Sequence, residues 1–371
     1  VGRRRAADAA GRRCTSGYRS PPLATARHRP RPPRRPPHAP ALAALLEVAD
    51  LHVTLNTARG PAHALRQVSF AMQRGDTVGL IGESGCGKSI TALALMGLLP
   101  DGARVAGSIR FDGRELTALG EDALCDLRGA RIGMIFQEPM TALNPLHTIG
   151  RQIAEPLRLH QGLTAAAARA EALRLLERVQ LPDAKKRLDA WPHQMSGGQR
   201  QRVVIAIALA CGPDLLIADE PTTALDVTIQ QQILDLISEL VAERGMALIL
   251  ISHDLGVIAQ NVDRMLVMYG GSVVESGPTD TVFAHRMHPY SRGLFGARPR
   301  LDAPRGQRLV TIAGTVPELV DLPAGCPFAG RCSFTVDTCL HTPPPRVELG
   351  DEHAVRCSQL EAVAAASGEA A

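Results

Sequence analysis

The chain has 371 residues, of which 45% are hydrophobic and 3% aromatic, so it can bury a sizeable core made mainly of Leu, Ile, Val and Ala. No stretch approaches the roughly 18 uncharged apolar residues of a membrane span. No apolar segment follows the charged N-terminus as it would in a signal peptide, so we expect the chain to reside in a reducing cytosol. The formal net charge of +4 combines +10 on residues 1–40 with −6 on the rest, which argues against nucleic acid as a partner of the folded part.

Residues 1–45 form a tail that we expect not to fold, because its segment RHRPRPPRRPPHAP is rich in Pro and Arg and cannot build a core. It can be interpreted as a disordered arm, as an anchor to nucleic acid or lipid, or as sequence upstream of the true start. The initial Val and the Ala, Arg and Pro bias favour the third interpretation, in which the tail is not native.

From residue 46 to about 276, short apolar strands alternate with helices, which predicts a mostly parallel α/β sheet. We expect an edge strand in LEVADLHVTL, a second strand in HALRQVSFAM, and buried strands in DTVGLIG, RIGMIFQ, LLIAD and MALILIS. Helical spacing marks KSITALALMGLL, residues 164–180, QRVVIAIALA and TIQQQILDLISELVAER. Helix-rich sequence at about 138–200 interrupts the pattern like an inserted subdomain, and residues 277–371 become Pro-rich and irregular.

A phosphate-binding loop is predicted at GESGCGKS, which matches G-x-x-x-x-G-K-[ST] after a strand and before a helix. The glycines let backbone N–H groups point at phosphate oxygens, and the helix N-terminus adds a positive dipole end. Lys88 is expected to reach the β- and γ-phosphates and the Ser89 hydroxyl to ligate Mg²⁺, whereas the Cys86 thiol is incidental. The alternative is a chance glycine-rich turn. The residues predicted to bind ATP here are Gly82, Ser84, Gly85, Cys86, Gly87, Lys88, Ser89 and Ile90.

A second acidic element follows in LLIADE, where four apolar residues predict a buried strand. This strand would deliver Asp219 to the Mg²⁺ site, and Glu220 would polarise the attacking water. An apolar run before Asp-Glu is common by itself. It becomes specific downstream of a phosphate-binding loop.

The segment MSGGQRQR at 195–202 resembles the signature sequence of ABC-type ATPases, with Gln137 in FQEP, Asp226 in ALD and His253 in ISHD in the family's order. The resemblance covers about 48–275. It implies a P-loop NTPase (RecA-like) α/β nucleotide-binding domain at 46–276 with an inserted helical subdomain at about 138–200. It also implies head-to-tail dimers, in which Gln137 touches Mg²⁺ and His253 positions the water of Glu220. The residues that would contact ATP of the opposite subunit are Ser196, Gly197, Gly198 and Gln199.

One position departs from the family pattern. The family usually has an aromatic residue about 25 positions before the phosphate-binding loop, to stack on adenine, and Leu55 stands there. Stacking of a base on an aromatic ring is worth roughly 1–3 kcal/mol in nucleic-acid binders, so we expect weaker ATP binding.

FQEPMTALNP, ADEPTTALDVTIQQQIL, HPYSRGLF and GCPFAGRC resemble the D-type ATPase subunits of oligopeptide and dipeptide importers. This implies a peripheral subunit on the cytoplasmic face of the inner membrane that powers peptide import. Its partners would be an F-type paralogue or a second copy, two permease subunits and, indirectly, an extracytoplasmic substrate-binding protein. Nickel and glutathione importers share this ATPase type. A soluble ABC ATPase and a non-hydrolysing ABC subunit are two further function classes that carry the same motifs.

Four of the eight cysteines lie at the C-terminal end, with the spacing C-x5-C-x6-C-x17-C: Cys326, Cys332, Cys339 and Cys357. Disulfides are not expected in the cytosol, and the surrounding Gly, Pro and Arg are poor core sequence. Zinc usually uses closer pairs, so the spacing favours a [4Fe–4S] cluster over Zn²⁺, with buried thiols without metal as the third alternative. A structural or redox-regulatory role, apart from the ATP motifs, is expected.

Overall fold

A computed structural model describes residues 44–223, 225–297, 311–350 and 352–366. The predicted tail at 1–45 lies outside these residues except for its last two. Within the described part of the chain, no helix has both the length and the apolar character needed to cross a membrane.

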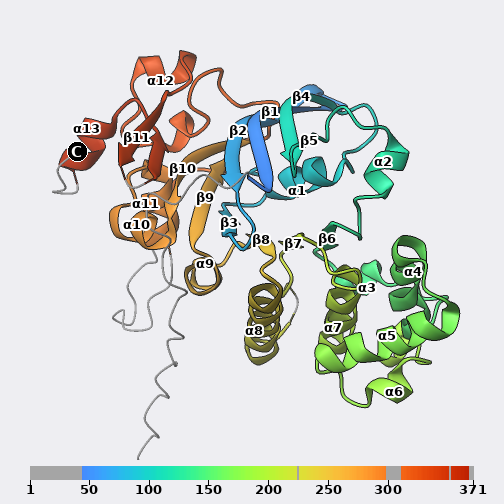
Figure 1. The fold of residues 1–371 in the computed structure, drawn as a ribbon. Coiled ribbons are helices and arrows are strands. Elements are labelled where there is room, and N and C mark those ends of the chain that lie inside the picture. The colour runs from blue at the N-terminus through green and yellow to red at the C-terminus, as the bar shows by residue number, and fades with distance from the viewer. Residues whose placement is uncertain (1–43, 224, 298–310, 351, 367–371) are drawn as a thin grey trace, which may run out of the picture. The chain divides into compact units, whose positions relative to one another are not determined.

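A small antiparallel sheet contains the first two predicted strands (Figure 1). Its strands are β1 (Leu46–Thr57), β2 (Gly60–Met72), β4 (Arg104–Phe111) and β5 (Arg114–Glu115), in the order β2-β1-β4-β5. The prediction of an edge position for β1 was wrong, because β1 pairs with β2 on one side and β4 on the other. The alternation of buried and exposed residues in β1 indicates that one face of the sheet is solvated. Interior and edge strands of such a sheet show the same alternation, so the pattern does not distinguish them.

A second sheet carries the predicted buried strands, in the order β11-β12-β10-β9-β3-β8-β7-β6. The pairs among β9, β3, β8, β7 and β6 are parallel. Strands covered on both faces read as continuous apolar runs, as β3, β6, β7 and β8 do. The strands are β3 (Thr77–Ile81), β6 (Ile132–Ile135), β7 (Leu215–Asp219), β8 (Ala247–Ile251), β9 (Arg264–Tyr269), β10 (Ser272–Pro278), β11 (Arg346–Gly350) and β12 (His353–Arg356).

Helices follow the parallel strands and also form a helical lobe between β6 and β7 (Figure 1). The helices outside the lobe are α1 (Lys88–Met96), α2 (Glu121–Cys125), α8 (Val227–Arg244) and α9 (Leu255–Asn261). The lobe contains α3 (Pro139–Ala142), α4 (Ile149–Gln161), α5 (Ala165–Arg178), α6 (Ala184–Arg187), a 3₁₀ turn (Pro192–Gln194) and α7 (Gly197–Ala208). Helix α5 begins where Thr164 accepts the N–H of Ala167, and α4, α5 and α7 pack on one another through buried aliphatic side chains.

The C-terminal region forms more regular structure than its Pro-rich sequence predicts. Its elements are α10 (Thr279–His285), α11 (Pro289–Gly296), a 3₁₀ turn (Ala329–Arg331), α12 (Asp337–His341), β11, β12 and α13 (Leu360–Ala365). Strand β12 pairs with β10, Glu275 opposite Val355, so the C-terminal strands extend the sheet that carries the predicted ATP motifs. The buried side chain of His353 lies 2.9 Å from the carboxylate of Glu275 and fixes this junction.

Candidate functional site

The predicted phosphate-binding loop lies between β3 and α1, where its backbone requires glycine. Gly82 has a φ of 156° and a Cβ there would collide with the carbonyl oxygen of Met268. Gly87 caps α1 with a φ of 106°, and a Cβ there would lie 2.9 Å from Leu65. The sequence therefore folds into a loop that closes tightly on β9 and β2 and opens directly into the N-terminus of a helix.

Lys88 and Ser89 lie at the start of α1. The Lys88 ammonium donates to the carbonyl oxygens of Gly82, at 2.8 Å, and Glu83, at 3.1 Å, so it spans the loop that it belongs to. Ser84 and Gly85 are exposed at the tip of the loop, Cys86 is buried, and Ser89 and Ile90 are half-buried. Burial raises the pKa of the Cys86 thiol, in keeping with an incidental side chain.

Asp219 ends β7 next to Ser89. Burial raises the pKa of Asp219, and the Ser89 hydroxyl opposes that shift by donating a hydrogen bond. The Oδ1 atom of Asp219 is buried without a hydrogen-bond partner among the described residues. Because buried polar atoms are normally satisfied, an orphaned carboxylate oxygen beside a hydroxyl suits an oxygen-seeking cation such as Mg²⁺.

Glu220, Gln137 and His253 meet although they come from three separate loops. The Gln137 amide donates to Glu220 at 3.3 Å, Thr223 donates at 3.0 Å to the same oxygen, and His253 Nδ1 lies 3.3 Å from the other oxygen. Glu220 has a φ of 46°, a left-handed backbone that costs a non-glycine residue about 1–3 kcal/mol. Strain held at a carboxylate among three polar neighbours is typical of a functional position.

The signature residues begin α7 in the helical lobe. Ser196 accepts the N–H of Gln199, and the Gln199 side chain accepts the N–H of Ser196, which forms a reciprocal cap. Gly197 and Gly198 follow in the first turn, and Gly198 packs closely on Ile229 of α8. Asp226 caps α8 by accepting the N–H groups of Thr228 and Ile229. The structure therefore assigns both motifs a local capping role, and contact of the signature with ATP of another subunit stays a prediction.

Leu55 lies in β1, is half-buried and packs against the hydrophobic cluster beneath the small sheet. No Phe, Tyr or Trp occurs between Val48 and Phe70, so no neighbouring residue of this stretch replaces the missing ring. The expectation of weaker adenine stacking stays a prediction.

The four C-terminal cysteines are free thiols that lie near one another. Burial raises the pKa of Cys326 to about 11, and the neighbouring thiols of Cys357, Cys332 and Cys339 act in the same direction. Backbone N–H groups two residues ahead donate to the sulfurs of Cys332 and Cys357, each at 3.4 Å. Even so, no three His, Cys, Asp or Glu side chains of the described chain stand in an arrangement that could hold a metal ion.

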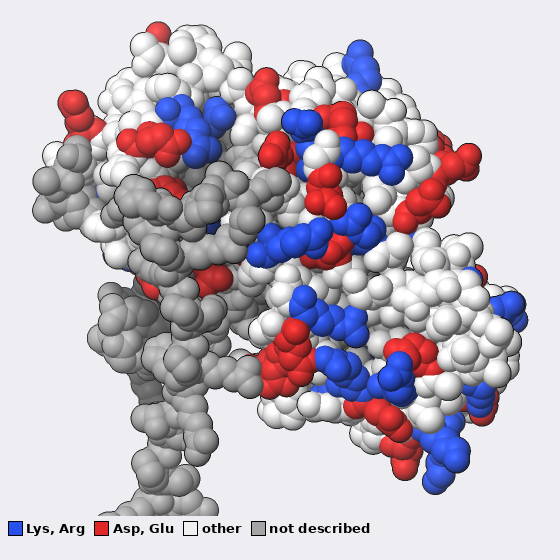
Figure 2. Space-filling model, viewed as in Figure 1, with Lys and Arg blue, Asp and Glu red and all other residues white. Residues whose placement is uncertain are grey.

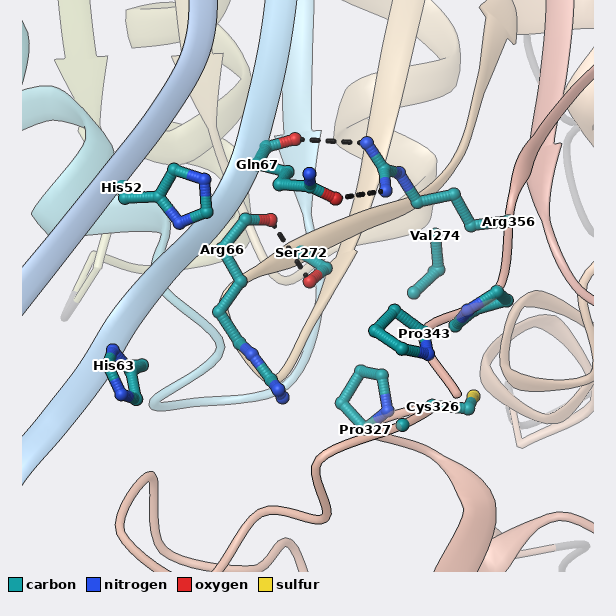
Figure 3. Close-up of a pocket in the computed structure, with 12 residues that line it drawn as sticks. His52, His63, Arg66, Gln67, Ser272, Val274, Cys326, Pro327, Pro343 and Arg356 are labelled. Atoms are coloured by element: carbon teal, nitrogen blue, oxygen red, sulfur yellow. Dashed lines mark hydrogen bonds between the residues drawn. The ribbon is translucent and has the colours of Figure 1, made fainter. Parts of the chain in front are cut away.

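A cavity of about 410 Å³ separates the small sheet from the C-terminal region (Figure 3). Arg66, Gln67 and Arg356 line it, together with Cys326, and Arg356 donates to the side chain and carbonyl of Gln67. Arg66 donates to the carbonyl oxygens of Pro323 and Ala324. The cavity contains none of the predicted ATP residues, and its arginines join the C-terminal region to β2.

Three residues at the site were missed by the sequence analysis. Glu83 occupies an unspecified position of the phosphate-binding pattern, yet its carboxylate pairs with Arg331 and its N–H donates to the hydroxyl of Tyr290. The four cysteines lie outside the predicted ATP motifs, but Arg331, which immediately precedes Cys332, reaches Glu83 of the phosphate-binding loop. Arg331 and Tyr290 lie in the segments GCPFAGRC and HPYSRGLF, which the sequence analysis had singled out. That both contact Glu83 was not visible in the sequence.

Comparison with known proteins gives two family matches. A model described as ABC transporter matches residues 65–223, and one described as oligopeptide/dipeptide transporter, C-terminal region, matches 274–339. Oligopeptide transport ATP-binding protein OppD of Salmonella typhimurium is 51% identical over 300 residues, 81% of this chain and 89% of that protein. OppD of Mycobacterium tuberculosis is 48% identical over 320 residues, and the chain spans about half of it, 52%. The dimeric structure of MJ0796, a bacterial ABC transporter cassette, matches with a TM-score of 0.57 and 29% identity, over 63% of this chain and 98% of that one.

Proposed function

The chain belongs to the ABC transporter ATP-binding proteins, in their oligopeptide and dipeptide branch, and on this premise we propose that it hydrolyses ATP to power peptide import. The observation that carries the proposal is the meeting of Gln137, Glu220 and His253 at the end of the strand that holds Asp219, with Lys88 and Ser89 beside it. The names of the relatives supply the substrate class, since OppD proteins are oligopeptide transport proteins.

The residues at the loop would bind the nucleotide. Backbone N–H groups of residues 84–89 and the N-terminus of α1 attract phosphate oxygens, and the Lys88 ammonium compensates their charge. Ser89, Gln137 and the orphaned oxygen of Asp219 would hold Mg²⁺. The metal would neutralise charge on the phosphates.

Glu220 would activate the attacking water. Its carboxylate is mostly buried, with 14% of the side chain exposed, and is oriented by Gln137, Thr223 and His253. A positioned base of this kind contributes typically 10²–10⁴ in rate. His253 is 69% exposed, which leaves its other nitrogen accessible to a γ-phosphate.

The partners follow from the family. The signature residues Ser196 to Gln199 would complete the ATP site of a second ABC ATPase, an F-type paralogue or another copy, and the helical lobe would contact two permease subunits. A substrate-binding protein outside the membrane would deliver the peptide, and the chain would act on the cytoplasmic face. Nucleic acid is not expected among the partners, and on the face drawn in Figure 2 basic and acidic side chains intermingle.

The four cysteines would hold a [4Fe–4S] cluster, with Zn²⁺ or no metal as the alternatives. The four thiols lie near one another, and N–H groups directed at two of the sulfurs would stabilise thiolates bound to either metal. The sulfurs would need to move closer together, since the described residues form no metal-ready group.

The test is reconstitution with the two permeases and the substrate-binding protein in vesicles. ATP-dependent uptake of a labelled tetrapeptide, absent in a Lys88→Ala transporter, is the expected result. Uptake of nickel or glutathione but not of peptide would show that the proposed substrate class is wrong. A chain that never co-purifies with polytopic subunits would indicate a soluble ABC ATPase instead.

A further inference from the structure

Glu83 is an acidic residue in a loop that is proposed to bind a polyanion. It lies directly after Gly82, and its side chain is about a quarter exposed, at 26%. A free carboxylate at this place would repel phosphate groups, because like charges a few ångströms apart cost free energy even near a protein surface. The arrangement around Glu83 therefore bears directly on nucleotide affinity.

Arg331 neutralises Glu83 from the C-terminal region. Its guanidinium donates to both carboxylate oxygens, at 2.7 and 3.2 Å, and only 6% of its side chain is exposed. Further donation to the carbonyls of Ala313, at 2.9 Å, and Ile312, at 3.4 Å, fixes the plane of the fork. Paired, bidentate and buried, this contact has the geometry of a strong charge-assisted hydrogen bond.

Tyr290 holds the backbone of the same residue. The Glu83 N–H donates to the Tyr290 hydroxyl at 2.8 Å, so this N–H is engaged by the C-terminal region. Tyr290 lies in the first turn of α11, which starts at Pro289 after His288 caps the helix by accepting the Tyr290 N–H. The Tyr290 ring packs on Tyr269 and Phe328, so the position of its hydroxyl is set by a rigid aromatic cluster.

A second contact ties the same region to the hairpin that follows Leu55. Arg59, between β1 and β2, pairs with Glu318 at 2.7 Å and Asp321 at 2.8 Å. These side chains are at least half exposed, and such pairs contribute little to stability. The segment between Ile312 and Asp321 thus runs from the phosphate loop to the hairpin.

We propose that the C-terminal region sets the nucleotide affinity of this chain, with Arg331 and Tyr290 as positioning residues that act through Glu83. The proposal rests on the ATP binding proposed above. Arg331 removes the repulsive charge of Glu83, and Tyr290 sets the backbone of the loop. Arg331 is adjacent to Cys332 in the sequence, so the guanidinium that pairs with Glu83 belongs to the segment that carries the four cysteines.

The test is titration of the full chain with MgADP by calorimetry. Arg331→Gln should weaken binding on the order of tenfold, because the Glu83 carboxylate would then face the phosphate groups without its compensating cation. Arg331→Lys should restore part of the loss, because it returns the charge without the fork. The matched control is Arg346→Gln, since exposed Arg346 pairs with Glu348 within β11, and it should bind as the wild type does.

A double-mutant cycle identifies Glu83 as the route. In a Glu83→Gln background the carboxylate is already neutral, so Arg331→Gln should weaken MgADP binding much less than it does alone. Additive effects of the two substitutions, or wild-type affinity in a folded Arg331→Gln variant, would overturn the proposal. If Arg331→Gln does not fold, Tyr290→Phe keeps the ring and removes the hydroxyl, and unchanged affinity there would overturn it equally. A wild-type chain that does not bind MgADP would refute the proposed function instead.

Discussion

Lys88 and Glu220 have separable roles at the residue scale. Lys88 bridges the phosphate loop and Glu220 lies with Gln137 and His253 at a different strand end. Lys88→Ala should abolish measurable ATP binding, because the phosphate charge loses its nearest compensating ammonium. Equilibrium binding of a fluorescent ATP analogue measures this, with Lys185→Ala on exposed α6 as the control that should bind normally. Tight binding by the Lys88→Ala variant would contradict the role of Lys88.

Leu55 gives a second residue-scale prediction. Leu55→Tyr should tighten ATP binding severalfold if the ring reaches adenine, by analogy with base stacking worth about 1–3 kcal/mol. The same titration with ATP and with inorganic triphosphate separates the base from the phosphates. The gain should appear for ATP alone, and equal affinities of variant and wild type for ATP would show that another group already serves the base.

At the element scale, the start of α11 should make folding sensitive to acid. Burial lowers the pKa of His288 to about 4, and its Nδ1 accepts the Tyr290 N–H, so the folded state holds the neutral ring. In the unfolded chain His288 binds a proton as the pH falls through about 6.5, whereas in the folded chain it stays neutral until about pH 4. The free energy of unfolding is therefore highest above pH 6.5 and falls as the pH drops toward 4. Between pH 7 and 5 this amounts to about 2 kcal/mol.

Urea unfolding at pH 7 and pH 5 measures the effect. His288→Asn keeps a capping side chain without a titrating ring and should reduce the pH dependence in this window by that amount. Burial acts to raise the pKa of Glu275, but its hydrogen bonds to His353, Ser291 and the backbone lower the pKa overall. The stability that Glu275 contributes is therefore lost only at a pH below this window. An unchanged pH dependence in His288→Asn would contradict the assignment.

The segment from Cys326 to Cys357 carries the metal prediction. Anaerobic purification should give brown protein with broad absorption near roughly 400 nm and about four irons per chain. Cys332→Ser should remove the colour without changing ATP binding, whereas Cys125→Ser, which alters an exposed cysteine of α2, should leave the colour unchanged. Colourless protein whose four thiols are all freely alkylated in the native state would refute the cluster. Zinc bound to a colourless protein would instead support the Zn²⁺ alternative.

At the scale of the whole molecule, local patterns were predictable and long-range contacts were not. The phosphate loop follows from glycines that must adopt positive φ within eight residues, and the parallel strands follow from continuous apolar runs. The pairing of β12 with β10 and the ion pair of Glu83 with Arg331 join positions far apart in the chain, 248 residues for the latter. Nothing in the local sequence of Glu83 distinguishes a paired carboxylate from a solvated one.

The meeting of Gln137, Glu220 and His253 was partly predictable from the sequence. Each follows a strand of the parallel sheet, and the carboxyl ends of parallel strands share one edge, which explains why motif order alone located them. The backbone strain of Glu220 and the orphaned oxygen of Asp219 were invisible in the sequence, because both depend on the three-dimensional surroundings of the end of β7.

We propose that this site hydrolyses ATP with Glu220 as the general base. Single-turnover hydrolysis in the assembled transporter tests it, with wild type and Glu220→Gln at matched ATP occupancy. We predict equal ATP affinity, a rate lower by on the order of 10²–10⁴ in the variant, and a closed ATP-bound dimer that persists. Hydrolysis by Glu220→Gln at near wild-type rate would contradict the role of Glu220 as the base.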